Sequence, residues 1–250
     1  MNAVPESYLG VWRRTLLTTT GGLHDASTDV YWLQTARLFA DLRIPRPTPE
    51  NATTLALQAG FAGVTEVRGD ICQWHRAIDF QPPSGRDDIG RMHFERPDYL
   101  LEDGLDGSYH EVWERLPESL GGNWGTWLRA DDGRQGCLLL AGDCFLFAAG
   151  RRQALPQAPD LGTLLAASGD AELLNFELSF GRHQQGATPW RIALSTLPGR
   201  AGQALLPASV APAGLDLALD DGLLAMLGAQ PPATGWQRCD EPSLAPEVTP

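Results

Sequence analysis

A short motif near the start of the chain recurs near its middle. Gly10-Val11-Trp12-Arg13 stands close to the N-terminus, and Gly125-Thr126-Trp127-Leu128-Arg129 follows at an offset of 115 residues. Four further matches keep the same order: Phe39-Ala40 with Phe147-Ala148, the Trp74 to Arg76 region with Trp190-Arg191, Leu101-Glu102-Asp103-Gly104 with Leu219-Asp220-Asp221-Gly222, and Trp113-Glu114-Arg115 with Trp236-Gln237-Arg238. Ordered matches with drifting offsets indicate two diverged copies whose loops differ in length. The repeat predicts two copies of one small domain.

Both copies consist of short segments typical of strands. They are rich in Val, Ile, Trp, Tyr and Phe and are separated by Gly, Pro, Asp and Asn, which indicates antiparallel meanders. Strands are expected at 8–17, 29–35, 37–44, 62–67, 71–80, 89–95 and 108–116, and again at 124–130, 135–140, 143–150, 172–181, 189–196 and 215–219. One short helix is expected in each copy, at 45–60 with Pro49 at its first position and at 159–167.

The predicted fold class is all-β, with two tandem antiparallel barrels that each carry one short helix. Residues 1–118 form the first barrel and residues 119–240 the second, with a linker at 117–122. The last segment, 241–250, is expected to be a disordered tail.

The repeated Gly-x-Trp motif is suited to closing a barrel. The glycine permits a backbone approach that a Cβ would block, and the Trp two residues later points to the same face and plugs the end. An Arg on the last strand can lie over that Trp ring, and Arg115 and Arg238 are placed for this contact in the two copies. Closure also removes exposed sheet edges.

This combination resembles the lipocalin-like, or calycin, superfamily, in which a Gly-x-Trp first strand and a terminal Arg flank a ligand-enclosing barrel. The tandem pair also resembles a little-characterised group of bacterial and fungal double-barrel proteins, through Tyr31-Trp32-Leu33-Gln34-Thr35 and Ala40-Asp41-Leu42-Arg43-Ile44-Pro45. The resemblance implies a fold more than an activity. The glycine-rich continuation after Trp that heme-binding relatives carry is absent here, which argues against heme.

Charge and composition exclude several classes of partner. The 19 basic residues are all Arg and the formal net charge is −12, so the surface repels phosphate backbones and anionic lipid. We therefore expect no nucleic-acid and no membrane partner, and a cytoplasmic location because residues 1–8 do not form a secretion signal. Cys72, Cys137, Cys144 and Cys239 lack the paired spacing of zinc sites and are expected to be reduced. No metal site and no cofactor are expected, and a homodimer is left open.

Alternation along the strands divides the first barrel into two faces. One face is apolar apart from Arg76: Leu38, Ala40, Leu42, Ile44, Cys72, Trp74, Ile78, Phe80, Met92, Phe94 and Val112. The opposite face mixes aromatic and ionisable side chains: Trp32, Gln34, Phe39, Asp41, Arg43, Gln73, His75, Asp79, Arg91, His93, Glu95, Tyr109, Glu111 and Trp113. If the apolar face lines the barrel, the interior is an apolar pocket or a packed core. If the mixed face lines it, aromatic walls enclose charged groups.

Three hypotheses for function follow from these faces. The first is that the first barrel binds a small, largely apolar organic molecule, and its ligand-binding residues are Trp32, Gln34, Phe39, Tyr109 and Trp113. The second is a cofactor-independent isomerase, cyclase, lyase or hydrolase acting on a small hydrophobic substrate, and its catalytic residues are His75, Asp79, Glu111, Asp41 and Arg43. The third is a structural or interaction scaffold. Motifs for nucleotide use, zinc hydrolysis and serine hydrolysis are absent from the sequence.

The enzyme hypothesis makes specific geometric predictions. Asp41 and Arg43 are expected to pair. His75 and Asp79 lie four residues apart on one strand, so they are expected to face the same way and form a proton-transfer couple with Glu111.

Overall fold

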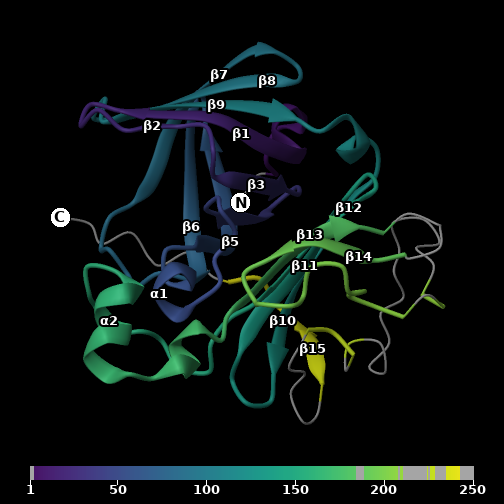
Figure 1. Ribbon diagram of the computed structural model, residues 1–250. Coiled ribbons are helices and arrows are strands. Elements are labelled where there is room, and N and C mark those ends of the chain that lie inside the picture. The colour runs from purple at the N-terminus through teal and green to yellow at the C-terminus, as the bar shows by residue number, and fades with distance from the viewer. Residues whose placement is uncertain are drawn as a thin grey trace.

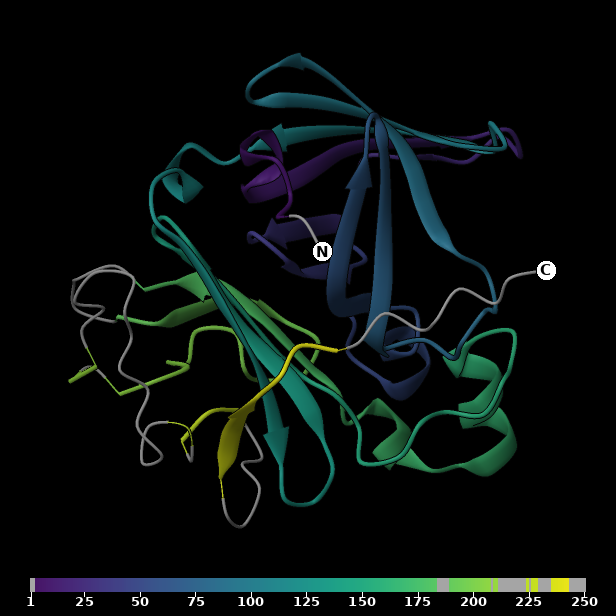
Figure 2. The ribbon, with the colours of Figure 1, turned by 180° about the vertical axis from the view of Figure 1, so that it is seen from behind.

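The structure is a computed structural model that describes residues 3–183, 189–207, 209–210, 224, 226–228 and 235–242. Two antiparallel sheets dominate it, and the first of them closes on itself. Figure 1 shows the two sheets packed against each other, with helices α1 and α2 beside them, and Figure 2 shows the same arrangement from behind. The described part of the chain is therefore mainly β, as predicted.

The first sheet closes into an eight-stranded antiparallel barrel in the described residues. Its strands are β1 (Gly10–Thr19), β3 (Asp29–Gln34), β4 (Leu38–Ile44), β5 (Ala59–Arg68), β6 (Ile71–Asp79), β7 (Asp88–Arg96), β8 (Tyr99–Gly104) and β9 (Tyr109–Arg115). Consecutive strands pair with each other, and β1 also pairs with β9, which completes the circle. A short strand, β2 (His24–Asp25), pairs with the end of β1. This up-and-down closure is a closed antiparallel barrel, as the sequence predicts for the first half of the chain.

The first Gly-x-Trp motif closes one end of this barrel. Gly10 has a φ of 122°, and a Cβ there would lie 3.0 Å from Ser119 Oγ, so only glycine fits without strain. Trp12 is fully buried inside, and the guanidinium carbon of Arg115 lies 4.6 Å from its ring centroid. Arg115 also donates to the carbonyl oxygen of Leu9 at 3.0 Å. The predicted contact between the last strand and Trp12 is confirmed.

The second sheet has the strand order β14-β13-β12-β11-β10-β15. Its strands are β10 (Asn123–Ala130), β11 (Gln135–Ala141), β12 (Cys144–Ala149), β13 (Glu177–Arg182), β14 (Arg191–Ser195) and β15 (Trp236–Cys239). Within the described ranges no pairing joins β14 to β15, so closure of a second barrel stays a prediction. The predicted strand at 215–219 and most of the predicted tail, 243–250, lie outside those ranges. Glu241, at the start of that tail, forms an ion pair with Arg37.

The second Gly-x-Trp motif is used differently from the first. Trp127 packs into the core between the two sheets, and its indole N–H donates to Gln135 Oε1 at 3.1 Å. Arg238 lies over Trp124 instead, 5.7 Å from the ring centroid. The prediction that Arg238 covers the Trp of the repeated motif is therefore wrong, because the side chain of Trp127 is taken up by packing between the sheets.

Both predicted helices are present, with one change of position. Helix α1 (Ala52–Leu55) begins after Asn51, whose side chain accepts from the backbone N–H of Thr54, so Pro49 lies before the helix and not at its first position. Helix α2 (Leu161–Ser168) begins after Asp160 as predicted. Three 3-10 turns, η1 (Glu6–Tyr8), η2 (Pro117–Ser119) and η3 (Ala171–Leu174), complete the described elements. The turn η2 lies at the predicted linker, although the exact domain boundaries and the duplication remain predictions.

The two sheets share one apolar core. On β4, Leu38, Leu42 and Ile44 are buried against residues of the second sheet such as Leu139 and Leu178. This packing turns the apolar face of β3 and β4 toward the second sheet, so the mixed face of these two strands points into the barrel. On β6 and β7 the apolar face points inward instead, because its residues join the barrel's own core: Cys72, Trp74, Met92 and Phe94. Each of the two predicted interpretations therefore holds for part of the barrel.

Candidate functional site

The interior of the barrel is aromatic at its closed end. Trp12 stacks on Trp32 with ring centroids 6.3 Å apart, and Trp32 meets the edges of Trp74 and Trp113 at 5.4 and 5.8 Å. Tyr8 of η1 is buried in the same cluster. These rings fill the closed end, so an apolar ligand has little room there.

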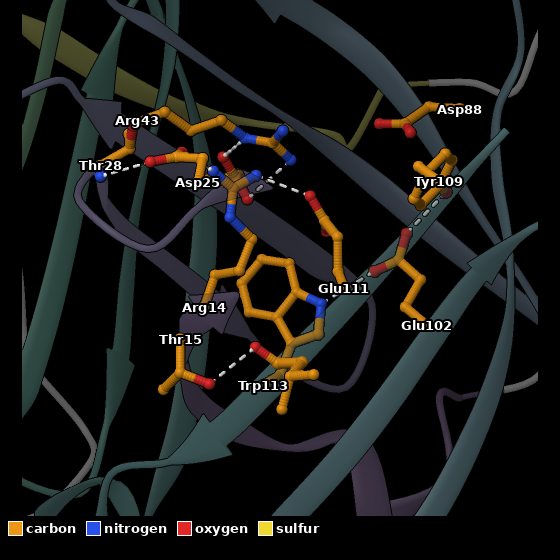
Figure 3. A network of polar contacts seen from close by, with 12 residues as sticks. Arg14, Thr15, Asp25, Thr28, Arg43, Asp88, Glu102, Tyr109, Glu111 and Trp113 are labelled. Carbon is orange, nitrogen blue, oxygen red and sulfur yellow. Dashed lines mark hydrogen bonds and ion pairs between the residues drawn. The ribbon is translucent and has the colours of Figure 1, made fainter. Parts of the chain in front are cut away.

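The other half of the interior carries an arginine held between two acids. Arg14 donates from Nη1 to Glu111 Oε1 at 2.6 Å and from Nη2 to Asp25 Oδ2 at 2.9 Å, as Figure 3 shows. The side chains of Arg14 and Glu111 are only 5% and 6% exposed. Charges this deeply buried are tolerated in proteins when they are paired and hydrogen-bonded.

A second ion pair joins Asp41 and Arg43, two residues apart on β4. Arg43 Nε donates to Asp41 Oδ1 at 2.7 Å, which confirms the predicted pairing. Burial acts to lower the pKa of Arg43, but the charges of Asp41 and Glu111 outweigh it and the pKa is raised. Arg43 therefore stays a cation inside the barrel.

Glu102, on β8, is a buried carboxyl group that forms no ion pair with an arginine among the residues described. Tyr109 donates its hydroxyl proton to Oε1 at 2.8 Å, and Trp113 donates its indole N–H to Oε2 at 3.1 Å (Figure 3). Burial first, and then the charge of Glu111, raise the pKa of Glu102 well above its ordinary value. Burial and Glu102 likewise raise the pKa of Tyr109. Burial and the neighbouring charge of Glu111 thus favour the neutral form of the Glu102 carboxyl group.

A β-bulge in β6 separates His75 from Asp79. Phe61 pairs with Asp79 and Val64 pairs with His75, and the register shifts by one residue between them at Ala77. Because directly paired residues point to the same face, Asp79 lies on the inner face with Phe61, while His75 lies on the outer face with Val64. The expectation that His75 and Asp79 face the same way is therefore wrong, and the extra residue is the reason.

The two residues have different neighbours as a result. Asp79 lies at the rim of the barrel, where Arg76 donates to its Oδ2 at 2.9 Å and to Asp88 Oδ2 at 2.8 Å. His75 is 3.6 Å from Glu66 on the outside of the barrel. Burial raises the pKa of Asp79, although Arg76 acts against that rise. The couple of His75, Asp79 and Glu111 proposed for catalysis does not form.

Two hollows lie next to each other on either side of Trp74 and Asp88. The recess, of about 20 Å³, lies inside the barrel and is lined by Trp32, Phe39, Asp41, Arg43, Phe61, Trp74, Asp88, Glu102 and Trp113. The cleft, of about 750 Å³, lies between β6 with its following loop and the second half of the chain around Gln135, Arg151 and Phe176. Trp74 and Asp88 line both hollows, so the recess and the cleft are adjacent.

The structure brings together most of the predicted site residues. Trp32, Phe39, Asp41, Arg43 and Trp113 line the recess. Tyr109 and Glu111 belong to the hydrogen-bonded network around it. Gln34 does not, because its amide is used for structure: its oxygen accepts from Trp32 Nε1 and Thr65 Oγ1, and its nitrogen donates to the carbonyl oxygens of Thr35 and Leu38.

Sequence reasoning missed Glu102, Asp88 and Arg14. Glu102 was missed because strand β8 was not predicted, although Pro97-Asp98 after β7 is a turn signal and Leu100, Glu102 and Gly104 alternate with the pleat. Asp88 lies one residue before the predicted start of its strand. Arg14 offers no signal of its own, since an Arg on a strand is usually solvated.

Other kinds of site find little support in the described residues. Within them, no group of three or more His, Cys, Asp or Glu side chains is arranged to hold a metal ion. The four cysteines are unpaired, and burial raises the pKa of the Cys144 thiol to about 12, so it stays protonated. None of the helices described has the length and apolarity needed to cross a bilayer.

Comparison with known proteins shows a shared fold without a shared sequence. No protein-family model matches the chain, and none of the curated proteins searched is similar to it in sequence. The chain is similar in structure to the uncharacterized protein YLR301w of Saccharomyces cerevisiae, with a TM-score of 0.58 and 11% identity over 94% of this chain and 99% of the yeast chain. It also matches a lipocalin-like protein of Bacteroides uniformis, with a TM-score of 0.33 and 10% identity over 44% of this chain and 99% of that one. The yeast protein thus has the same fold across nearly the whole chain.

Proposed function

We propose that the protein binds a small organic molecule at the open end of the first barrel, with the ligand body in the cleft and one polar group in the recess. The observation that carries the proposal is that Trp74 and Asp88 line both hollows. A volume of about 750 Å³ is typical of small-molecule sites, whereas about 20 Å³ accommodates only a water-sized group. Ile78, Leu155 and Phe176 supply apolar surface for the ligand body.

The position of the ligand can be tested by filling the cleft. Ala154 lines the cleft and is exposed, so Ala154→Trp occupies part of its volume without disturbing a buried residue. Ala167→Trp, on the exposed face of α2, is the matched control. We expect library compounds that raise the melting temperature of the natural protein to lose that effect in Ala154→Trp and keep it in Ala167→Trp. A ligand present at a hundred times its Kd stabilises the fold by about 2.7 kcal/mol, which a thermal scan detects.

Two results count against this proposal. Binding that persists unchanged in Ala154→Trp places the ligand elsewhere. The absence of any stabilising or tryptophan-quenching compound in a broad library of small organic molecules removes the proposal altogether, since Trp74 lines both hollows and its emission reports on either.

Acid–base catalysis is a second candidate function, favoured by Glu102. Glu102, a carboxyl group whose pKa is raised, lines the recess together with Asp88, which is paired with Arg76, and two carboxyl groups in such different surroundings are the pattern by which one site holds an acid and a base together. A bound ligand that exchanges carbon-bound hydrogen for deuterium in D2O, with the exchange lost in Glu102→Gln, supports catalysis. Unchanged ligand over days of incubation supports binding alone.

A further inference from the structure

In its neutral form, Glu102 has one more hydrogen-bonding group than its protein partners use. Its two oxygens accept from Tyr109 and Trp113, and a neutral carboxyl group also carries an O–H that needs an acceptor. Tyr109 can accept that proton only if its own hydroxyl turns to the carbonyl oxygen of Ile89, which is 3.5 Å away and at the limit of a hydrogen bond. The O–H of Glu102 is therefore left for the recess that Glu102 lines.

Arg43 brings a second donor to the same recess. Its Nε and Nη2 donate to Asp41, at 2.7 and 3.4 Å. Its Nη1 has no hydrogen-bond partner among the residues described, and its side chain is 28% exposed. A guanidinium group has five N–H donors, so Arg43 retains donors for a group placed in the recess.

The acids around the recess are already engaged by arginines. Asp41 is paired with Arg43, Asp88 with Arg76, and Glu111 with Arg14. An ammonium group in the recess would have to displace one of these arginines. A carboxylate or phosphate there would lose its hydration without gaining a net positive charge, because these acids already neutralise the arginines. The recess is thus suited to an uncharged acceptor, and a volume of about 20 Å³ admits a single oxygen atom.

We infer that the recess is a carbonyl pocket, in which the Glu102 carboxyl group and the Arg43 guanidinium group both donate hydrogen bonds to one carbonyl oxygen of an uncharged ligand. The inference rests on the proposed function, because the ligand body must then lie in the cleft. Two donors match the two lone pairs of a carbonyl oxygen. Figure 3 shows Glu102 and Arg43 projecting from different strands of the barrel around this polar interior.

The test uses four naphthalenes that share one body and differ in one group. They are 2-acetylnaphthalene, 2-ethylnaphthalene, 2-naphthoate and 2-naphthylmethylamine, and their Kd values are measured by quenching of tryptophan emission. We expect the ketone to bind about tenfold more tightly than the hydrocarbon, which is the effect of hydrogen bonds that replace those of water. We expect the carboxylate and the amine to bind no better than the hydrocarbon.

Variants of Glu102 give a second readout. Glu102→Gln keeps a neutral N–H donor, so it retains the preference for the ketone, and Glu102→Leu loses it. In the natural protein the preference is present while Glu102 is protonated and is lost as the pH rises through its raised pKa, whereas in Glu102→Gln it is independent of pH. The groups facing Glu102 are Tyr109, Glu111, Asp88 and Arg43. Glu95→Gln, exposed on β7, is the control and is expected to match the natural protein.

The outcomes separate this inference from the proposed function. Equal binding of ketone and hydrocarbon, both lost in Ala154→Trp, overturns the carbonyl pocket and leaves the binding site in place. Tightest binding by the amine or by the carboxylate overturns the inference as well. If none of the four probes binds at concentrations up to its solubility limit, the result counts against both the carbonyl pocket and the proposed binding function. If Glu102→Leu fails to fold, Arg43→Met replaces it and is expected to reduce the ketone preference in the same way.

Discussion

Arg14 lies between two acids in the polar half of the barrel, and its contribution to stability depends on what its removal leaves behind. Glu111 and Asp25 are largely buried, and both accept hydrogen bonds from the two ends of the same guanidinium group. A buried ion pair stabilises a protein little more than an apolar pair of the same shape would. A buried acid that has lost its cation, however, lowers the free energy of unfolding strongly. The charge network around the recess therefore depends on Arg14 even though Arg14 does not line the recess.

Arg14→Met tests this dependence. We expect the free energy of unfolding to fall by about 3–5 kcal/mol, because Glu111 and Asp25 lose their only arginine among the contacts described here. The matched control is Arg91→Met, since Arg91 and its partner Asp70 are both more than half exposed and such pairs contribute at most about 1 kcal/mol. Urea denaturation of both variants gives the comparison. Equal losses in the two variants would mean that burial of the Arg14 network has no energetic consequence.

At the scale of the element, β6 decides the geometry of the site through its bulge. The extra residue, Ala77, is unpaired between the pairs Ala62–Ile78 and Gly63–Arg76, and it puts Arg76 and Asp79 on the inner face and His75 on the outer face. Gly63 permits this arrangement because a Cβ there would lie 1.9 Å from the carbonyl oxygen of His75. Because Ala77 and Gly63 allow Arg76 to lie on the inner face, Arg76 binds Asp88 at the rim of the barrel.

Gly63→Ala is therefore expected to destabilise the protein by about 3 kcal/mol or more, because the added methyl group forces the β5 and β6 backbones apart. Gly21→Ala is the control: a Cβ at Gly21 meets only Thr19 Oγ1, at 3.6 Å, and is expected to change stability by less than about 0.5 kcal/mol. Thermal unfolding followed by circular dichroism compares the two. A mild effect at Gly63 would show that the bulge can relax without cost.

The same strand shows where prediction from sequence succeeds and fails. The alternation of Cys72, Gln73, Trp74 and His75 is regular, and their two faces are as predicted, but nothing in the residue types marks the extra residue at Ala77. The direction of each face, inward or outward, also could not be predicted, because it depends on the second sheet that covers Leu42 and its neighbours. Local patterns determine the strands, whereas packing of distant elements determines which side becomes the site.

At the scale of the whole molecule, one core joins the barrel to the second sheet. Leu178 of β13 is fully buried in this core, and a Cβ placed on Gly60 of β5 would lie 2.2 Å from its Cδ1. Arg151 adds a polar connection, since it donates to the carbonyl oxygens of Asp79 and Phe80 on the barrel side and of Leu173 on the other. Burial lowers the pKa of Arg151 to about 10, because carbonyl groups do not neutralise its charge.

A shared core of this kind makes cooperative unfolding the expected behaviour. We predict a single calorimetric transition with a ratio of calorimetric to van't Hoff enthalpy of about 1. Leu178→Ala is expected to lower the stability by about 2–5 kcal/mol and to reduce hydrogen-exchange protection in β4 and in β12 equally, because its cavity opens between the sheets. Leu57→Ala, at a side chain that is 67% exposed, is expected to change neither. Loss of protection in β12 with β4 unaffected would mean that the barrel holds its open end without support from the second sheet, and the cleft between them would then form only while both halves stay docked.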